Sequence, residues 1–154
     1  MPTAIVAFVA ASVAQAPAAS ADFAGDLANA VMQARGTSCG QLRRDPSADQ
    51  TAVFVVQTTN KYLNHTARVA PGRVNAQGQL IVDPLPMLKD LGSKASSAKS
   101  IEGAGKTQAD AIKSTVITGY RDIPNCSYTE YGMAVLPNDN PDGYFLTALV
   151  LAGS

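Results

Sequence analysis

The chain has 154 residues, of which 46% are hydrophobic and 16% are charged, and it carries 12 basic and 12 acidic side chains. This length suits one domain with a core of ordinary size, and the apolar content excludes an intrinsically disordered chain. The formal net charge of zero, without any basic run, argues against a nucleic-acid-binding protein, because such binding requires a positive surface.

Residues 1–21 contain no charged side chain and are interpreted as an export signal. Their apolar stretch, Ala4 to Ala14, is too short to cross a bilayer, and Ala19-Ser20-Ala21 is a small-x-small sequence that suits signal peptidase. No Lys or Arg precedes the apolar stretch, so the signal is atypical or the true start lies upstream; a buried N-terminal helix is the alternative. We expect a signal peptide at 1–21 and one mature domain at 22–154, without a transmembrane segment.

Cys39 and Cys126 are the two cysteines of the chain, and an even count in an exported protein predicts one disulfide bond between them. Neither belongs to a Cys-x-x-Cys pair or a His/Cys cluster, which argues against redox catalysis and structural zinc. A crosslink over so long a loop stabilises a fold by up to about 4–5 kcal/mol.

Two long helices are predicted in the first half of the chain. The first covers residues 21–35, with an apolar side chain at every fourth position, and ends at Gly36. The second begins at the Asp45 cap, followed by proline at its first position, and continues to Asn64. Its β-branched part, residues 51–59, is by itself compatible with a strand, but the length of the pattern favours a helix.

Residues 68–98 are predicted to be irregular, with a short helix over residues 85–92 and then a short strand that ends near Glu102. Thr107 is predicted to cap a further helix, because Asp110 follows three positions later. Its predicted buried face consists of Ala109, Ile112, Val116 and Tyr120.

Two strands are predicted at the end of the chain, over residues 126–136 and 143–153, with a hairpin connection rich in proline and glycine. The second is almost wholly apolar, as expected of a strand that is covered on both faces. This order of elements predicts an α+β domain in which helices pack on a small antiparallel sheet. Four tyrosines near this sheet either line a hydrophobic groove or pack in the core: Tyr120, Tyr128, Tyr131 and Tyr144.

The stretch Gly103–Thr107 reads "GAGKT" and imitates the end of a nucleotide-binding P-loop. The full pattern requires a further glycine five positions before Gly105, where this chain has Ser100. The preceding residues are also too polar for the buried strand from which a P-loop starts. We therefore interpret the stretch as a glycine turn that leads into a capped helix.

His65 is the only histidine, and a single imidazole makes neither a metal site nor a catalytic triad without partners. The acidic residues are scattered singly, and the run at 138–143 lacks the twelve-residue loop of a calcium site. His65 is accordingly a weak metal-ligand candidate, Glu102 is a weaker one, and no catalytic or cofactor-binding residue is assigned.

Several stretches resemble the CAP superfamily, which comprises the cysteine-rich secretory, antigen 5 and pathogenesis-related-1 proteins. "SIEGAGKTQADAIKSTVITGY" is similar to the family's "GENIA-x-G-x-x-T" turn and the helix after it, and "YTEYGMAV" to a strand ending in "G-v-G-v". The other similar stretches are "LANAVMQARGTSCGQL", "DPSADQTAVFVVQTTNKYLNHT" and "GYFLTALVLAG". The resemblance covers nearly all of the mature chain through loose motifs, and it implies an α–β–α sandwich and secretion to the exterior or the cell envelope.

Members of this superfamily often hold a divalent cation with two histidines and two glutamates. His65 falls at the position of the first histidine, Glu102 is displaced by two or three positions from a glutamate, and "KSTVITGY" offers no second histidine. The resemblance therefore implies a protein without an intact tetrad or cofactor. It favours a protein that binds an apolar small molecule such as a lipid, or an extracellular protein, over an enzyme. The alternatives are a cell-envelope hydrolase that uses His65 and a purely structural envelope protein.

Overall fold

The structure is a computed structural model that describes the backbone of residues 18–67, 73–74 and 80–154, and the side chains of residues 22–67 and 82–154. The proposed signal peptide lies mostly outside these described residues. The helices are α1 (Ala18–Arg35), α2 (Pro46–Leu63), α3 (Leu85–Asp90) and α4 (Gln108–Thr118). The strands are β1 (Arg43–Arg44), β2 (Arg73–Val74), β3 (Leu80–Ile81), β4 (Ser97–Gly105), β5 (Glu130–Leu136) and β6 (Phe145–Gly153).

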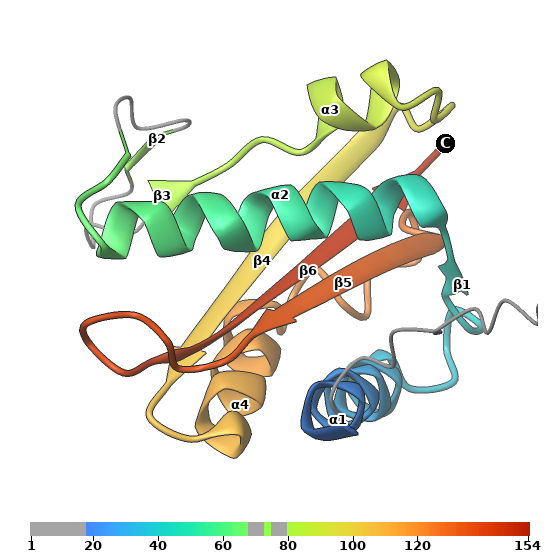
Figure 1. The fold of residues 1–154 in the computed structure, drawn as a ribbon. Coiled ribbons are helices and arrows are strands. Elements are labelled where there is room, and N and C mark those ends of the chain that lie inside the picture. Colours follow the sequence, from blue (N-terminus) through green and yellow to red (C-terminus); the bar gives the residue numbers. More distant parts are fainter. Residues whose placement is uncertain (1–17, 68–72, 75–79) are drawn as a thin grey trace, which may run out of the picture.

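The domain has three layers, with a sheet between two layers of helices (Figure 1). The main sheet has the strand order β1-β5-β6-β4, and α2 crosses one face while α1 and α4 cover the other (Figure 1). Strands β4, β5 and β6 pair antiparallel, but β1 pairs parallel with β5. The α+β fold with helices on a small sheet is thus confirmed, while the sheet is mixed rather than purely antiparallel.

Strand β6 is the centre of the hydrophobic core, as its apolar sequence predicted. Its side chains alternate between the two faces, so Ala148 and Val150 pack under α2, whereas Leu149 and Leu151 belong to the cluster on the α1/α4 side. Residues Leu146–Ala152 are all buried, because helices cover both faces of this strand.

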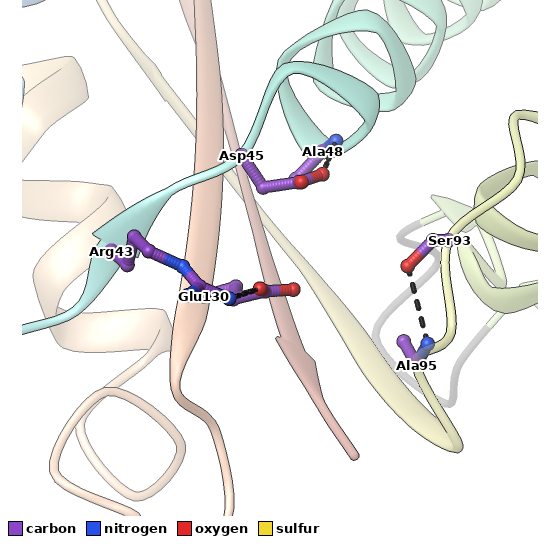
Figure 2. A network of polar contacts seen from close by, with 6 residues as sticks. All are labelled: Arg43, Asp45, Ala48, Ser93, Ala95 and Glu130. Atoms are coloured by element: carbon purple, nitrogen blue, oxygen red, sulfur yellow. Dashed lines mark hydrogen bonds and ion pairs between the residues drawn. The ribbon is translucent and has the colours of Figure 1, made fainter.

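Helix α2 begins where the Asp45-Pro46 pair predicted. The Asp45 carboxylate accepts a hydrogen bond from the Ala48 N–H at 2.9 Å, which satisfies one of the free amides of the first turn (Figure 2). Beside it, Arg43 on β1 pairs with Glu130 on β5, so the short parallel strand and the helix cap are fixed next to each other (Figure 2). The β-branched part of this segment is helical, and the strand alternative is wrong.

Glycine in β5 sets how closely α2 approaches the sheet. A methyl group at Gly132 would lie 2.1 Å from backbone atoms of Ala48 and Asp49. The Asp49 carboxylate also accepts a hydrogen bond from the Met133 N–H at 3.0 Å. The first turns of α2 therefore rest directly on the backbone of β5.

The end of α1 is tied to the segment between α4 and β5 by Arg35, which is only 3% exposed. Its guanidinium donates hydrogen bonds to four backbone carbonyls, those of Gly40, Ile123, Asn125 and Tyr128, at 2.7–3.3 Å. The predicted Cys39–Cys126 disulfide is present and joins the same two segments. One buried cation and one covalent bond thus close this end of the domain.

Strand β4 continues to Gly105, beyond the predicted end near Glu102. A Cβ atom at Gly105 would lie 2.4 Å from the Ala111 amide nitrogen, and one at Gly103 would lie 2.5 Å from the Ala111 carbonyl oxygen. The glycines that suggested a P-loop therefore allow α4 to pack against β4. Thr107 caps α4 as expected, because its hydroxyl accepts a hydrogen bond from the Asp110 N–H at 3.1 Å.

Candidate functional site

An open groove with a volume of about 520 Å³ lies between α1 and α4 on the outer side of that helical layer. Six of its eight lining residues have apolar side chains, and the volume lies within the range of roughly 300–1,000 Å³ that is typical of small-molecule sites. The lining residues are Ala30, Gln33, Ala34, Ala109, Ile112, Lys113, Val116 and Ile117.

The groove exists because α4 turns small side chains, rather than its large ones, toward the sheet. Ala111 and Thr115 are fully buried, and the Thr115 hydroxyl donates a hydrogen bond to the Ala111 carbonyl at 3.0 Å. Thr115 also contacts Thr147 on β6, whose hydroxyl donates to the Gly103 carbonyl at 3.2 Å. These contacts bring α4 close to the sheet; of its larger apolar residues, Ile112 packs partly against the core cluster on this side, whereas Ile117 is exposed.

The buried face predicted for α4 is therefore wrong for the most part, although Ile112 packs partly against the core. Ala109 is exposed, Ile112 and Val116 are half-buried, and Tyr120 is 61% exposed. Both faces of this helix carry small or apolar residues, so periodicity could not decide which of them faces the core. Three of the four residues assigned to the core instead line the groove.

Lys113 is the only charged side chain among the groove-lining residues. It is exposed and lies on the same helix as the apolar floor formed by Ile112 and Val116. Gln33 on α1 is the other polar lining residue. The groove therefore suits a ligand that is largely apolar and carries one acidic or hydrogen-bonding group.

Glu102 occupies a separate polar contact between β4 and α2, on the other face of the sheet. Its carboxyl oxygens lie 3.3 Å from the Thr59 hydroxyl and 3.4 Å from the Ser100 hydroxyl. Burial raises the pKa of Glu102 to about 7, although the two hydroxyls act to lower it. Neutral carboxylic acid is therefore abundant here at physiological pH.

Each hydroxyl beside Glu102 also has a backbone carbonyl as acceptor, which limits how strongly it stabilises the ionised carboxylate. Thr59 donates its proton to the Val55 carbonyl at 3.1 Å, and Ser100 donates its proton to the Val82 carbonyl. Since each hydroxyl has one proton, neither can also donate fully to a Glu102 carboxylate. The protonated acid, in contrast, can donate its own proton to one of these oxygens.

His65 lies at the C-terminal end of α2, where its side chain is exposed and its backbone has a φ of 54°. Thr59, which contacts Glu102, lies six positions before His65, and six residues of a helix span roughly 9 Å. His65 and Glu102 are therefore not side by side. In the described part of the chain, no three His, Cys, Asp or Glu side chains are grouped to hold a metal ion. Nothing in this arrangement supports a hydrolytic role for His65.

The four tyrosines fulfil different roles. Tyr131 is buried in the cluster on the α1/α4 side, and Tyr128 packs partly against that cluster. Tyr144 packs against the cluster under α2 and lies under Lys106, whose ammonium is 4.0 Å from the ring centroid. Tyr120 alone is largely exposed. The lysine of the P-loop-like stretch therefore contacts an aromatic ring in a surface turn.

Two solved structures share the fold of this chain at low sequence identity. An outer surface protein of Borrelia burgdorferi superposes with a TM-score of 0.62 at 11% identity, over 86% of this chain and 92% of that one. A cysteine-rich secretory protein of Staphylococcus aureus superposes with a TM-score of 0.56 at 12% identity. The superposition covers 88% of this chain but only 39% of the Staphylococcus aureus protein. The resemblance inferred from the sequence is thus confirmed at the level of the fold.

No protein-family model and no curated protein sequence matches the chain. Among the helices of the described residues, none is long and apolar enough to cross a membrane. The disulfide suits an oxidising compartment, and the two structural relatives are an outer surface protein and a secretory protein. The chain therefore has a CAP-like fold, which it shares with an outer surface protein and a secretory protein.

Proposed function

We propose that this protein is exported to the cell envelope or the exterior, and that it binds a long-chain fatty acid in the groove between α1 and α4. The observation that carries the proposal is the apolar groove itself, with Lys113 as its one charged lining residue. An acyl chain buries apolar surface against Ile112 and Val116, while its carboxylate pairs with the Lys113 ammonium.

Several features favour this ligand over a larger polar one. The groove is open, so a flexible chain can enter it without displacing a helix. Its lining offers apolar side chains from both helices but few hydrogen-bonding groups, which gives an extended sugar or peptide little to bind. Export and the shared fold are compatible with a role in lipid binding outside the cytoplasm.

Displacement of a fluorescent fatty acid by palmitate tests the proposal. Ala30→Leu and Ala109→Leu add side-chain volume to opposite walls of the groove, so each is expected to weaken palmitate binding about tenfold or more. Ala104→Leu, at an exposed alanine of β4 outside the groove, is the matched control and should bind palmitate normally. Equal affinity in all four proteins would place the ligand elsewhere and overturn the proposal.

The role of Lys113 is tested with a pair of ligands. Lys113→Gln should weaken binding of palmitate about two- to fivefold, because the lost ion pair is exposed to solvent. Binding of the uncharged methyl ester should not change. A variant that loses both ligands equally would show that the lysine supports the groove rather than the carboxylate.

A further inference from the structure

The C-terminal end of α4 carries the two most exposed large hydrophobic side chains of the described residues. Ile117 is 60% exposed and Tyr120 is 61% exposed. The Tyr120 N–H donates to the Ile117 carbonyl at 3.4 Å, so the helical turn continues and places the two side chains next to each other. Because Ile117 also lines the groove, this apolar surface continues the groove lining to the outside of the protein.

Two cations flank these apolar side chains. Lys113 lies one turn before Ile117, and the guanidinium carbon of Arg121 lies 5.2 Å from the centre of the Tyr120 ring. Both cations are exposed. The four residues Lys113, Ile117, Tyr120 and Arg121 are referred to below as the α4-end surface.

The nearest acidic residues in the sequence do not cancel this charge pattern. Asp122 is half-buried; burial raises the pKa of Tyr128, and the negative charge of Asp122 raises it further. Asp110 lies one turn before Lys113, and its carboxylate accepts a hydrogen bond from the Thr107 hydroxyl at 2.8 Å. The exposed charges of the α4-end surface are therefore positive.

We propose that the α4-end surface docks on an anionic lipid bilayer. Tyrosine places its ring at the apolar boundary and its hydroxyl among head groups, and an exposed isoleucine gains free energy by leaving water. Each Lys or Arg near an anionic membrane adds electrostatic attraction. The inference rests on the proposed function, because a groove that takes up acyl chains opens beside this surface and would be loaded from the bilayer.

Vesicle co-sedimentation tests this surface directly. The purified full chain is mixed with vesicles of phosphatidylcholine alone, or of phosphatidylcholine and phosphatidylglycerol. Tyr120→Ser and Arg121→Glu change the surface without changing a groove-lining residue. Phe54→Ser is the matched control, since Phe54 is 43% exposed but belongs to α2 on the opposite layer. All variants carry the same N-terminal segment, so its contribution to vesicle binding is common to them.

The expected result is stronger binding to the anionic vesicles, weakened by salt and reduced about tenfold by each α4-end variant. Phe54→Ser should bind as the unchanged protein does. Absence of vesicle binding, or equal loss in Phe54→Ser, would overturn the proposal. So would a result in which Tyr120→Ser abolishes self-association in sedimentation velocity and leaves vesicle binding intact, because the surface would then join two copies.

Palmitate binding in solution separates this inference from the proposed function. Tyr120→Ser and Arg121→Glu should bind palmitate with unchanged affinity, because neither residue lines the groove. If palmitate binds but vesicles do not, docking is wrong and the groove keeps its role. If the α4-end variants lose vesicle binding while palmitate never binds, the docking surface stands and the fatty-acid site is wrong.

Discussion

The two faces of the sheet are covered in different ways. On one face, α2 approaches β5 so closely that Gly132 has no space for a methyl group. On the other face, α4 also packs closely on the sheet, through Ala111 and Thr115. Its neighbour in that layer, α1, does not pack closely along its whole length, so an open groove remains between the two helices. The comparison shows that both helix–sheet contacts are close, and that the opening lies between two helices of one layer.

The largest expected effect tests the close contact of α2. Gly132→Ala would place a carbon 2.1 Å from the helix backbone, where no flexible side chain can move aside. We expect a loss of more than about 3 kcal/mol in the free energy of unfolding, which is a large part of the stability of a small domain. Urea unfolding followed by circular dichroism measures it.

Gly25 provides the matched control for that substitution. It lies in α1, and a methyl group added to its α-carbon would have no other atom within 4 Å. Gly25→Ala is therefore expected to stabilise the protein by about 0.4–1 kcal/mol, since alanine is the better helix former. Similar destabilisation by both substitutions would contradict the assigned difference in packing.

A second effect concerns the polar contact under α2. The pKa of Glu102 rises from an ordinary 4.5 to about 7 on folding, so the unfolded chain ionises first as the pH increases. The stability that depends on the neutral acid is complete below about pH 4.5 and is lost as the pH approaches 7. At pH 8 we expect the free energy of unfolding of Glu102→Gln to be higher than that of the unchanged protein by up to about 3 kcal/mol.

The pH-dependent difference between the two proteins should disappear well below pH 4.5, where Glu102 is neutral in both the folded and the unfolded chain. Urea unfolding at several pH values measures this difference, and other titrating groups cancel in it. A difference that does not depend on pH would show that folding leaves the pKa of Glu102 unchanged, contrary to the burial of this side chain.

A third effect tests the closure of the α1/α4 side. Arg35→Lys replaces a guanidinium group, which donates hydrogen bonds to four carbonyls, with a single ammonium group. Some buried carbonyls therefore lose their donor. We expect a cost of about 2 kcal/mol in thermal or urea unfolding. Arg43→Lys is the control; Arg43 is exposed and pairs with Glu130, so it should change stability little. Equal costs would mean that the buried carbonyls do not depend on Arg35.

A fourth effect, smaller than those of Gly132→Ala, Glu102→Gln and Arg35→Lys, is a gain. His65 has a left-handed backbone at φ 54°, a conformation that glycine adopts without steric cost. His65→Gly should therefore stabilise the protein by about 1 kcal/mol, as measured by a higher urea midpoint. It should leave palmitate binding unchanged, because His65 is not a groove residue. Lower stability in this variant would point to an interaction of the imidazole that offsets its backbone strain.

Much of the fold followed from local signals in the sequence. The Asp45 cap, the Thr107 cap and the apolar run of β6 each specify an element with little help from its neighbours. The disulfide followed from the count of two cysteines. The parallel pairing of β1 did not, because two arginines carry no signal of a strand or its direction.

The candidate site was harder to predict because it depends on which face of α4 turns inward. Ala111 and Thr115 face the sheet since Gly103 and Gly105 allow a close approach, so Val116 is only half-buried and Ile112 packs only partly against the core. The sequence did contain a signal for this packing: Ala111 and Thr115 form a stripe of small residues on α4, and Gly103 and Gly105 leave space for it on β4. The partner of Glu102, Thr59, lies 43 positions away and could be identified only once α2 and β4 were placed.

The central claim is that an acyl chain lies between α1 and α4, and methyl NMR of the palmitate complex tests it most directly. We expect intermolecular NOEs from the acyl chain to the methyl groups of Ile112, Val116 and Ile117. Val55 and Val56, in the core under α2, serve as reporters for the other face of the sheet and should show none. NOEs to these valines, or no NOE to the three groove residues in a saturated complex, would contradict the claim.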